Sequence, residues 1–158
     1  MVYISVIGSG DSSPEISELA YVVGKLLGKE GAILVCGGLG GVMDAAAKGA
    51  KEAGGLTVGI LPGNNRAGAS FFLDVVIPTG IGYARNALVV QAGDAVIAVG
   101  GESGTLSEIG FALKLGKPVV GLKTWQLCKQ GKETGHIVQA ASAKDAVEKA
   151  MALAQKSA

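Results

Sequence analysis

Residues 96–108 read VIAVGGESGTLSE, and this stretch decides the fold. Its first four residues are apolar and predict a buried strand, which a glycine-rich turn follows. A helical apolar pattern then begins at Leu106 and continues to Leu113. The first N–H groups of a helix have no partner inside the helix and carry partial positive charge, and glycines let a ligand approach them. The stretch therefore predicts a phosphate socket between a strand and a helix.

The same order of elements recurs along the chain. Strands are expected at residues 2–7, 32–36, 57–61, 74–78, 94–99, 118–122 and 137–140, and helices at 42–53, at 143–155, after Ser12, around Arg85 and from Leu106. Ser12 and Glu15 form an expected capping box, with Pro14 in the first turn. Residues 123–135 are expected to be an exposed loop or an irregular helix. The alternation predicts an α/β fold, a Rossmann-like open parallel sheet with helices on both faces.

The length agrees with a single domain over residues 1–158. Because of the predicted phosphate socket, we expect it to be a nucleotide-binding domain. The chain is 49% hydrophobic but only 4% aromatic, which suits an aliphatic parallel sheet. A net charge of +1 gives no general attraction to nucleic acid. No apolar run reaches membrane-spanning length, and the N-terminal run resembles a strand more than a signal peptide. Cys36 and Cys128 lack metal-ligand spacing, so we expect reduced thiols, no metal site and a cytoplasmic location.

Glycine turns at the ends of several expected strands should meet at one edge of the sheet. They lie at residues 8–10, 37–41, 62–63 and 100–104, and ligands bind at the carboxyl ends of strands in such sheets. None has the spacing of a P-loop or of the dinucleotide fingerprint. The predicted phosphate- or nucleotide-binding residues are Gly8, Ser9, Gly37, Gly38, Gly40, Gly101, Glu102, Ser103, Gly104 and Thr105. For residues 37–41, close strand–helix packing alone is the alternative.

Two charged side chains are the candidate catalytic residues. Arg85 is expected at a helix start, where its charge opposes the helix dipole, so a phosphate or Glu108 would be its partner. Glu108 is expected one turn into the helix after the socket, where it would face a sugar or an attacking water. The alternatives are a surface arginine and a carboxylate that only interacts with the helix N-terminus. Arg66, in the polar loop 64–70, either closes over an anion or is solvated.

These residues resemble the motifs of a known superfamily. Its signature Pro-Gly-Gly-x-Gly-Thr-x-x-Glu is similar to residues 100–108, with the last five positions kept. Its arginine at the preceding helix start corresponds to Arg85, and its glycine run before an alanine-rich helix resembles residues 37–43. The chain thus resembles the Rossmann-like superfamily of the LOG cytokinin-activating proteins, formerly labelled lysine decarboxylases. Within it, the chain looks most like the short branch related to the molybdenum cofactor carrier protein, with the DprA/Smf proteins as distant relatives.

The resemblance implies two kinds of function. LOG-type enzymes hydrolyse the N-glycosidic bond of nucleoside 5′-monophosphates and release the base and ribose 5-phosphate. In that case Arg85 would orient the leaving side, and Glu108 would stabilise positive charge on the ribose and position water. In the carrier branch, the same pocket would bind a phosphate-bearing pterin cofactor without chemistry.

Three positions depart from the superfamily pattern. Gly100 replaces the proline, Ser107 replaces an acidic residue, and Glu102 replaces a glycine of the phosphate turn. A carboxylate in that turn repels phosphate unless its side chain points away or binds a cation. We therefore expect binding of a nucleotide or nucleotide-like phosphate-bearing ligand. The alternatives are a LOG-type phosphoribohydrolase and a molybdenum cofactor carrier, while the near-neutral charge argues against a role on DNA.

The expected partners are small molecules and further copies of the chain. No cofactor is required for folding or chemistry, and the bound ligand would be a nucleoside monophosphate or a molybdopterin-type cofactor. The resemblance implies a homodimer or a higher homo-oligomer. The alanine-rich helix 42–53 and the apolar stretch 109–115 are the candidate surfaces. Neither a membrane nor a nucleic acid is expected as a partner.

Overall fold

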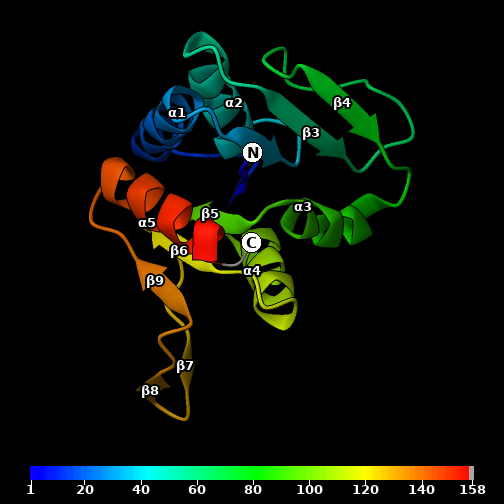
Figure 1. The fold of residues 1–158 in the computed structure, drawn as a ribbon. Coiled ribbons are helices and arrows are strands. Elements are labelled where there is room, and N and C mark those ends of the chain that lie inside the picture. The colour runs from blue at the N-terminus through cyan, green and yellow to red at the C-terminus, as the bar shows by residue number, and fades with distance from the viewer. Residues whose placement is uncertain (157–158) are drawn as a thin grey trace.

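A computed structural model describes residues 1–156 and contains seven parallel strands in one sheet (Figure 1). Their order is β4-β3-β2-β1-β5-β6-β9. The strands are β1 (Tyr3–Gly8), β2 (Ile33–Cys36), β3 (Thr57–Leu61), β4 (Val75–Pro78), β5 (Ala95–Val99), β6 (Val119–Leu122) and β9 (Ile137–Gln139). The chain leaves β1 toward β2 but leaves β5 toward β6, so the strand order reverses between β1 and β5.

Helices cover both faces of the sheet, as the sequence predicts. They are α1 (Pro14–Lys29), α2 (Val42–Glu52), α3 (Asn86–Ala92), α4 (Ser103–Lys114) and α5 (Ala143–Lys156), with a 3-10 turn η1 (Gly82–Arg85) before α3. Apolar residues of α1, α2 and α5 form one core, and those of α3 and α4 form the other. Strand β5 serves both, since Ile97 and Val99 face the first core while Val96 and Ala98 face the second. The Rossmann-like open sheet is therefore confirmed.

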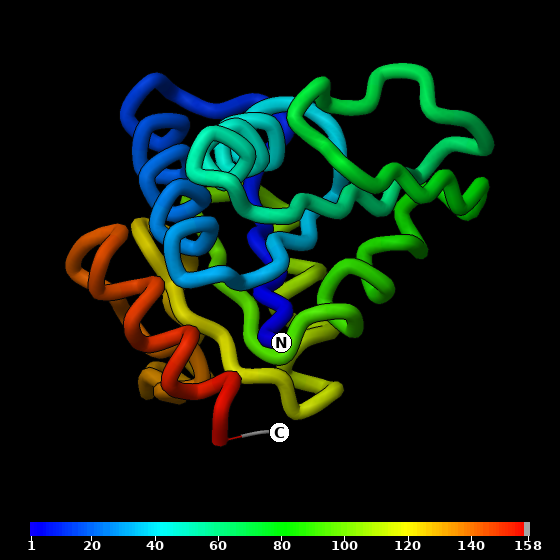
Figure 2. The backbone as a smooth tube through the Cα atoms, turned by 45° about the horizontal axis from the view of Figure 1, so that its top comes forward, coloured from blue at the N-terminus to red at the C-terminus, as the bar shows by residue number. Residues whose placement is uncertain are grey.

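Helices α1 and α2 lie against each other along their length (Figure 2). A Cβ atom added to Gly24 would stand 1.9 Å from the Ala46 carbonyl oxygen, and one added to Gly49 would stand 2.0 Å from the Tyr21 carbonyl oxygen. Only glycine fits where two helix backbones come so close. The alanine-rich side of α2, an expected oligomer surface, thus packs within the molecule, with Ala46 and Ala50 in the core.

Two local predictions need correction. The N-cap of α1 is Ser13, whose Oγ accepts a 3.3 Å hydrogen bond from the Ile16 N–H, so the capping box at Ser12 is wrong. Ser12 instead shares a 2.7 Å hydrogen bond with the hydroxyl of Ser17.

The second correction concerns residues 123–135. They contain an exposed antiparallel hairpin of β7 (Cys128–Lys129) and β8 (Lys132–Glu133) within a largely exposed loop, so the irregular-helix alternative is wrong. Its two turn residues, Gln130 and Gly131, both have positive φ, 51° and 76°, as a tight hairpin turn requires. Elsewhere, no helix within residues 1–156 is long and apolar enough to cross a membrane.

Candidate functional site

A crevice lies at the carboxyl ends of β1 and β5, where the strand order reverses. Its volume is about 200 Å³, and α2, α3 and α4 contribute side chains to its walls. Among the predicted site residues, those that line it are Gly8, Ser9, Arg85, Glu102, Gly104, Thr105 and Glu108. Leu39 and Pro62 line it too, so the structure brings both charged candidates and residues of all four glycine turns to one place, at the position where open α/β sheets bind ligands.

Five of the predicted residues lie outside the crevice lining. Gly37 lies behind Arg85, and its carbonyl oxygen accepts a 3.4 Å hydrogen bond from Nη2 of that arginine. Gly38 and Gly40 pack closely on neighbouring backbone, which agrees with the packing interpretation of residues 37–41. Gly101 has a φ of 101°, and a Cβ added to it would stand 2.4 Å from Thr105 Oγ1. Ser103 lines an adjoining hollow that shares Tyr83, Asn86 and Gly104 with the crevice.

The N-terminus of α4 forms one wall of the crevice. Glu102 is the N-cap residue, but its side chain makes no capping hydrogen bond and is exposed. The Leu106 N–H donates to the Glu102 carbonyl oxygen at 3.0 Å, so the amides of the preceding first turn have no helical acceptor. A Cβ added to Gly104 would meet open space. The wall thus offers unshielded N–H groups to an anion.

Arg85 is the buried cation of the site. Only 7% of its surface is exposed, and its guanidinium donates to two neutral oxygens, Asn86 Oδ1 and the Gly37 carbonyl. Its Nε is buried without a partner, and the arginine forms no ion pair within the described part of the chain. Burial lowers the pKa of Arg85, and the nearby charge of Glu108 opposes that effect. The surface-arginine alternative is therefore wrong.

Glu108 lies on the floor of the crevice from the second turn of α4. It is 7% exposed, and burial raises the pKa of its carboxyl group to about 7, although the charge of Arg85 lowers it. The carboxyl therefore changes protonation near neutral pH, as an acid or base requires. Thr105 adjoins it with a hydroxyl that is buried and has no hydrogen-bond partner.

Several lining residues escaped the sequence-based prediction. Asn86 and Tyr83 flank Arg85, and Ser107 lies behind Asn86 and accepts a 3.4 Å hydrogen bond from its Nδ2. The sequence signals Asn86 only by its position next to Arg85. Cys36 lies under the site, where burial raises its pKa to about 12, so it remains a thiol.

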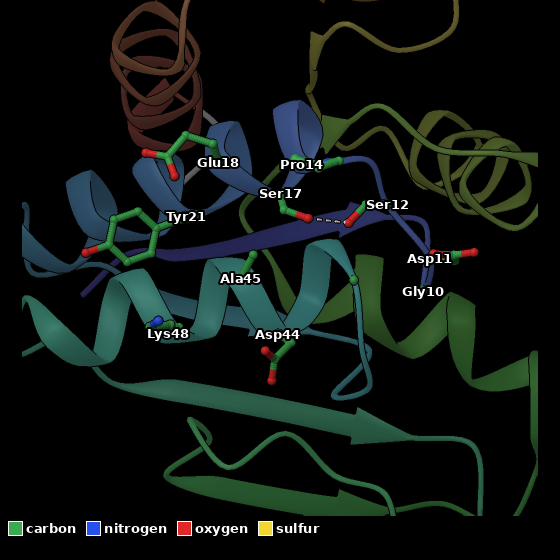
Figure 3. A pocket seen from close by; sticks show the side chains of 11 residues that line it. Gly10, Asp11, Ser12, Pro14, Ser17, Glu18, Tyr21, Asp44, Ala45 and Lys48 are labelled. Atoms are coloured by element: carbon green, nitrogen blue, oxygen red, sulfur yellow. Dashed lines mark hydrogen bonds between the residues drawn. The ribbon is translucent and has the colours of Figure 1, made fainter.

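A second hollow, of about 540 Å³, opens between α1 and α2 and shares Gly10 with the crevice (Figure 3). Asp11, Glu18 and Asp44 line it, against the single cation of Lys48. Its acidic character makes it a poor phosphate site, so the crevice is the better place for an anion. No group of three or more histidine, cysteine or acidic side chains within residues 1–156 could hold a metal.

Comparison with solved structures relates this fold to two proteins described as binding or carrying molybdenum cofactor. The molybdenum cofactor binding protein from Rippkaea orientalis is 38% identical, with a TM-score of 0.88 over 96% of each chain. The Moco carrier protein from Chlamydomonas reinhardtii is 35% identical, with a TM-score of 0.86 over 98% of each chain. DNA processing protein A from Helicobacter pylori, at 21% identity and a TM-score of 0.70 over 96% of this chain and 80% of that one, shares the fold alone.

Sequence comparison agrees with the structural one. An uncharacterized protein from Archaeoglobus fulgidus is 50% identical over 123 residues, which cover 78% of this chain and 81% of that protein. The profile of the SLOG cluster4 family, LDcluster4, matches residues 1–150. The resemblance inferred from Arg85 and the two glycine turns is thereby confirmed, and the chain belongs to the SLOG cluster4 family.

Proposed function

We propose that this protein binds a phosphate-bearing small molecule in the crevice, and that its ligand is a molybdopterin-type cofactor. The observation that carries the proposal is Arg85, a buried cation without a carboxylate partner, beside the open N-terminus of α4. A buried charge is normally paired, so an anion is the missing partner. The names of the relatives from Rippkaea orientalis and Chlamydomonas reinhardtii favour a molybdenum cofactor over other phosphate compounds.

The residues present fit the phosphate group of such a ligand. The amides of the first turn of α4 would donate to it, and Gly104 leaves room for its approach. The unpartnered hydroxyl of Thr105 would add a further hydrogen bond. Gly8 and Ser9, at the end of β1, would form the opposite wall. We assign no covalent chemistry to this binding function.

The test is ligand-induced thermal stabilisation, measured with molybdopterin, AMP and inorganic phosphate. We expect stabilisation of the wild type, strongest with molybdopterin, and its loss in Gly104→Asp, because a carboxylate would then occupy the phosphate position. Gly110→Asp is the matched control, since Gly110 is on the same helix with open space around it and lies outside the crevice lining. Equal stabilisation of the wild type and Gly104→Asp would refute the assignment of the socket.

One observation favours a second candidate, hydrolysis of nucleoside 5′-monophosphates. Glu108 is buried at the crevice floor with a pKa of about 7, and a carboxylate there would stabilise an oxocarbenium-like transition state and position water. Base release from a panel of nucleoside 5′-monophosphates, followed by chromatography, tests this activity. Release that disappears in Glu108→Ala would establish it. No release from folded wild-type protein would exclude hydrolysis of the tested nucleotides and leave binding as the function.

We also propose that the chain forms a homo-oligomer through α4 and the adjoining η1 turn. Tyr83 is 90% exposed, and Phe111 of α4 and Leu115, the C-cap residue of that helix, are exposed four residues apart. Tyr83 and Phe111 line the same surface hollow. Large apolar side chains gathered at one place on a surface are typical of protein contacts, and a second copy is the partner that the family resemblance implies.

A further inference from the structure

Asn86 connects the arginine of the crevice to the helix that would hold the phosphate. It is the first residue of α3 and is only 5% exposed. Its Oδ1 accepts from Arg85 Nη1, and its Nδ2 donates to Ser107 Oγ at 3.4 Å. The Ser107 hydroxyl in turn donates to the Gly104 carbonyl oxygen at 2.7 Å. One chain of hydrogen bonds therefore runs from the guanidinium to the first turn of α4.

The donor and acceptor roles in these hydrogen bonds fix the orientation of the Asn86 amide. Because Ser107 gives its proton to Gly104, its oxygen is left to accept from the Asn86 NH₂ group. The amide oxygen must then face Arg85, which can only donate. A reversed amide would direct N–H groups at the guanidinium. The side chain is therefore set to hold Arg85 by a neutral acceptor.

The neutrality of this acceptor matters for the charge of the crevice. The second acceptor, the carbonyl of Gly37, is also neutral. An aspartate in place of Asn86 would have nearly the same shape and would give Arg85 a buried ion pair. The asparagine also holds the guanidinium by a hydrogen bond but leaves its positive charge available. Two acidic residues, Glu102 and Glu108, line the crevice together with Arg85. Within residues 1–156, neither makes an ion pair with the arginine.

We propose that Asn86 is a positioning residue that holds Arg85 without neutralising it, and so makes the crevice select anionic phosphate groups over neutral ligands of similar shape. This inference rests on the proposed phosphate-binding function and adds the residue on which charge selection depends. It predicts that the crevice binds a phosphate monoester but not the corresponding neutral alcohol.

The test replaces Asn86 by aspartate and measures binding of inorganic phosphate through backbone amide shifts in NMR titrations. We expect at least a tenfold loss of phosphate affinity, together with unchanged or increased thermal stability of the ligand-free protein. A residue that only supports the fold would give the opposite pattern, with affinity kept whenever stability is kept. Phosphate affinity equal to that of the wild type in folded Asn86→Asp would overturn the inference.

A double-mutant cycle with Arg85→Gln shows whether Asn86 acts through the arginine. In the Arg85→Gln background, Asn86→Asp should change phosphate affinity less than threefold, because there is no guanidinium charge left to neutralise. A tenfold effect in that background would also overturn the inference. If Asn86→Asp does not fold, Asn86→Ala takes its place, and a fewfold loss of affinity that vanishes in the Arg85→Gln background is then expected. Wild-type protein that binds no phosphate-bearing probe would instead refute the proposed function itself.

Discussion

Glu108 is a residue whose burial costs stability in a pH-dependent way. Its pKa is about 7 in the folded protein against 4.5 for an ordinary glutamate, so the folded state holds a proton that the unfolded state loses first. Stability is therefore highest below pH 4.5 with respect to this group and falls as the pH rises toward 7. The change in pKa corresponds to about 3 kcal/mol. Such a cost is typical of groups kept for function rather than for folding.

The first prediction follows from this cost. Glu108→Gln removes the titration but keeps the shape, so the variant should be more stable than the wild type near pH 8 by about 2–3 kcal/mol. Near pH 5, where Glu108 is protonated in the folded protein, the two proteins should differ little. Urea unfolding at both pH values measures the difference. An equal difference at pH 5 and pH 8 would show that the carboxyl does not titrate in this range.

Glu102 gives a second prediction at the residue scale. Its carboxylate is exposed at the N-cap of α4 and makes no capping bond, while its backbone carbonyl accepts from Trp125 Nε1. Glu102→Gly should therefore leave the fold intact, remove repulsion between two negative charges and tighten phosphate binding severalfold. Isothermal titration with AMP and molybdopterin measures the effect. Weaker binding by the variant would mean that the Glu102 side chain takes part in recognition.

The sequence predicts crevice residues that belong to a recognisable motif and misses those that do not. Arg85 and Glu108 could be predicted because a charge at a helix start or beside a glycine turn needs an explanation. Asn86 could not, because an asparagine after an arginine has many structural uses, and its role depends on Ser107, 21 residues away. Gly101 lies outside the crevice lining and accommodates the Thr105 side chain, and the sequence does not distinguish such a glycine from one that accommodates a ligand.

At the scale of elements, the contact between α1 and α2 depends on glycines. Gly24→Ala should lower the free energy of unfolding by about 3 kcal/mol, because the new Cβ would stand 1.9 Å from a backbone oxygen of α2. Gly110→Ala is the control, and it should raise stability by about 1 kcal/mol, since its Cβ meets open space in a helix. Chemical denaturation of both variants provides the measurement. A Gly24→Ala variant as stable as Gly110→Ala would show that the two helices can move apart freely.

Helices and strands with a regular pattern of apolar residues can be predicted from the sequence, whereas the polar β7–β8 hairpin cannot. The central strands β3, β2, β1, β5 and β6 are mainly buried apolar runs, whereas the edge strands β4 and β9 are partly exposed. The predicted ranges of all seven strands agree closely with the observed ones. The β7–β8 hairpin has no apolar face, because both of its strands are exposed. Its Gln-Gly turn is also a weaker hairpin signal than Asn-Gly. The sequence predicts the N-cap of α1 at Ser12, one residue before its actual position at Ser13, because both serines have a hydroxyl that can accept from a helix N–H.

At the scale of the whole molecule, the crevice exists because the sheet grows in two directions from its middle. Alternating strands and helices predict a parallel sheet but leave the order of its strands open, and only that order brings β1 beside β5. Every strand of this sheet ends at the same edge, so the glycine turns after β1 and β5 become neighbours although more than 90 residues separate them. The strand order therefore sets the position of the crevice, and the residues of the motifs supply its charged and hydrogen-bonding groups.

The proposed oligomer is the prediction that belongs to this scale. Phe111→Glu places a charge within the exposed apolar group of α4, so it should convert an oligomer into a monomer without lowering the free energy of unfolding of the monomer. Leu56→Glu is the matched control, because Leu56 is 44% exposed against 42% for Phe111 but lies beside Lys51 and Asp74, away from α4. Light scattering coupled to size-exclusion chromatography gives the mass of each variant. An oligomer that survives Phe111→Glu would place the contact elsewhere, whereas a monomeric wild type would refute the proposed oligomer and make ligand binding a property of each chain alone.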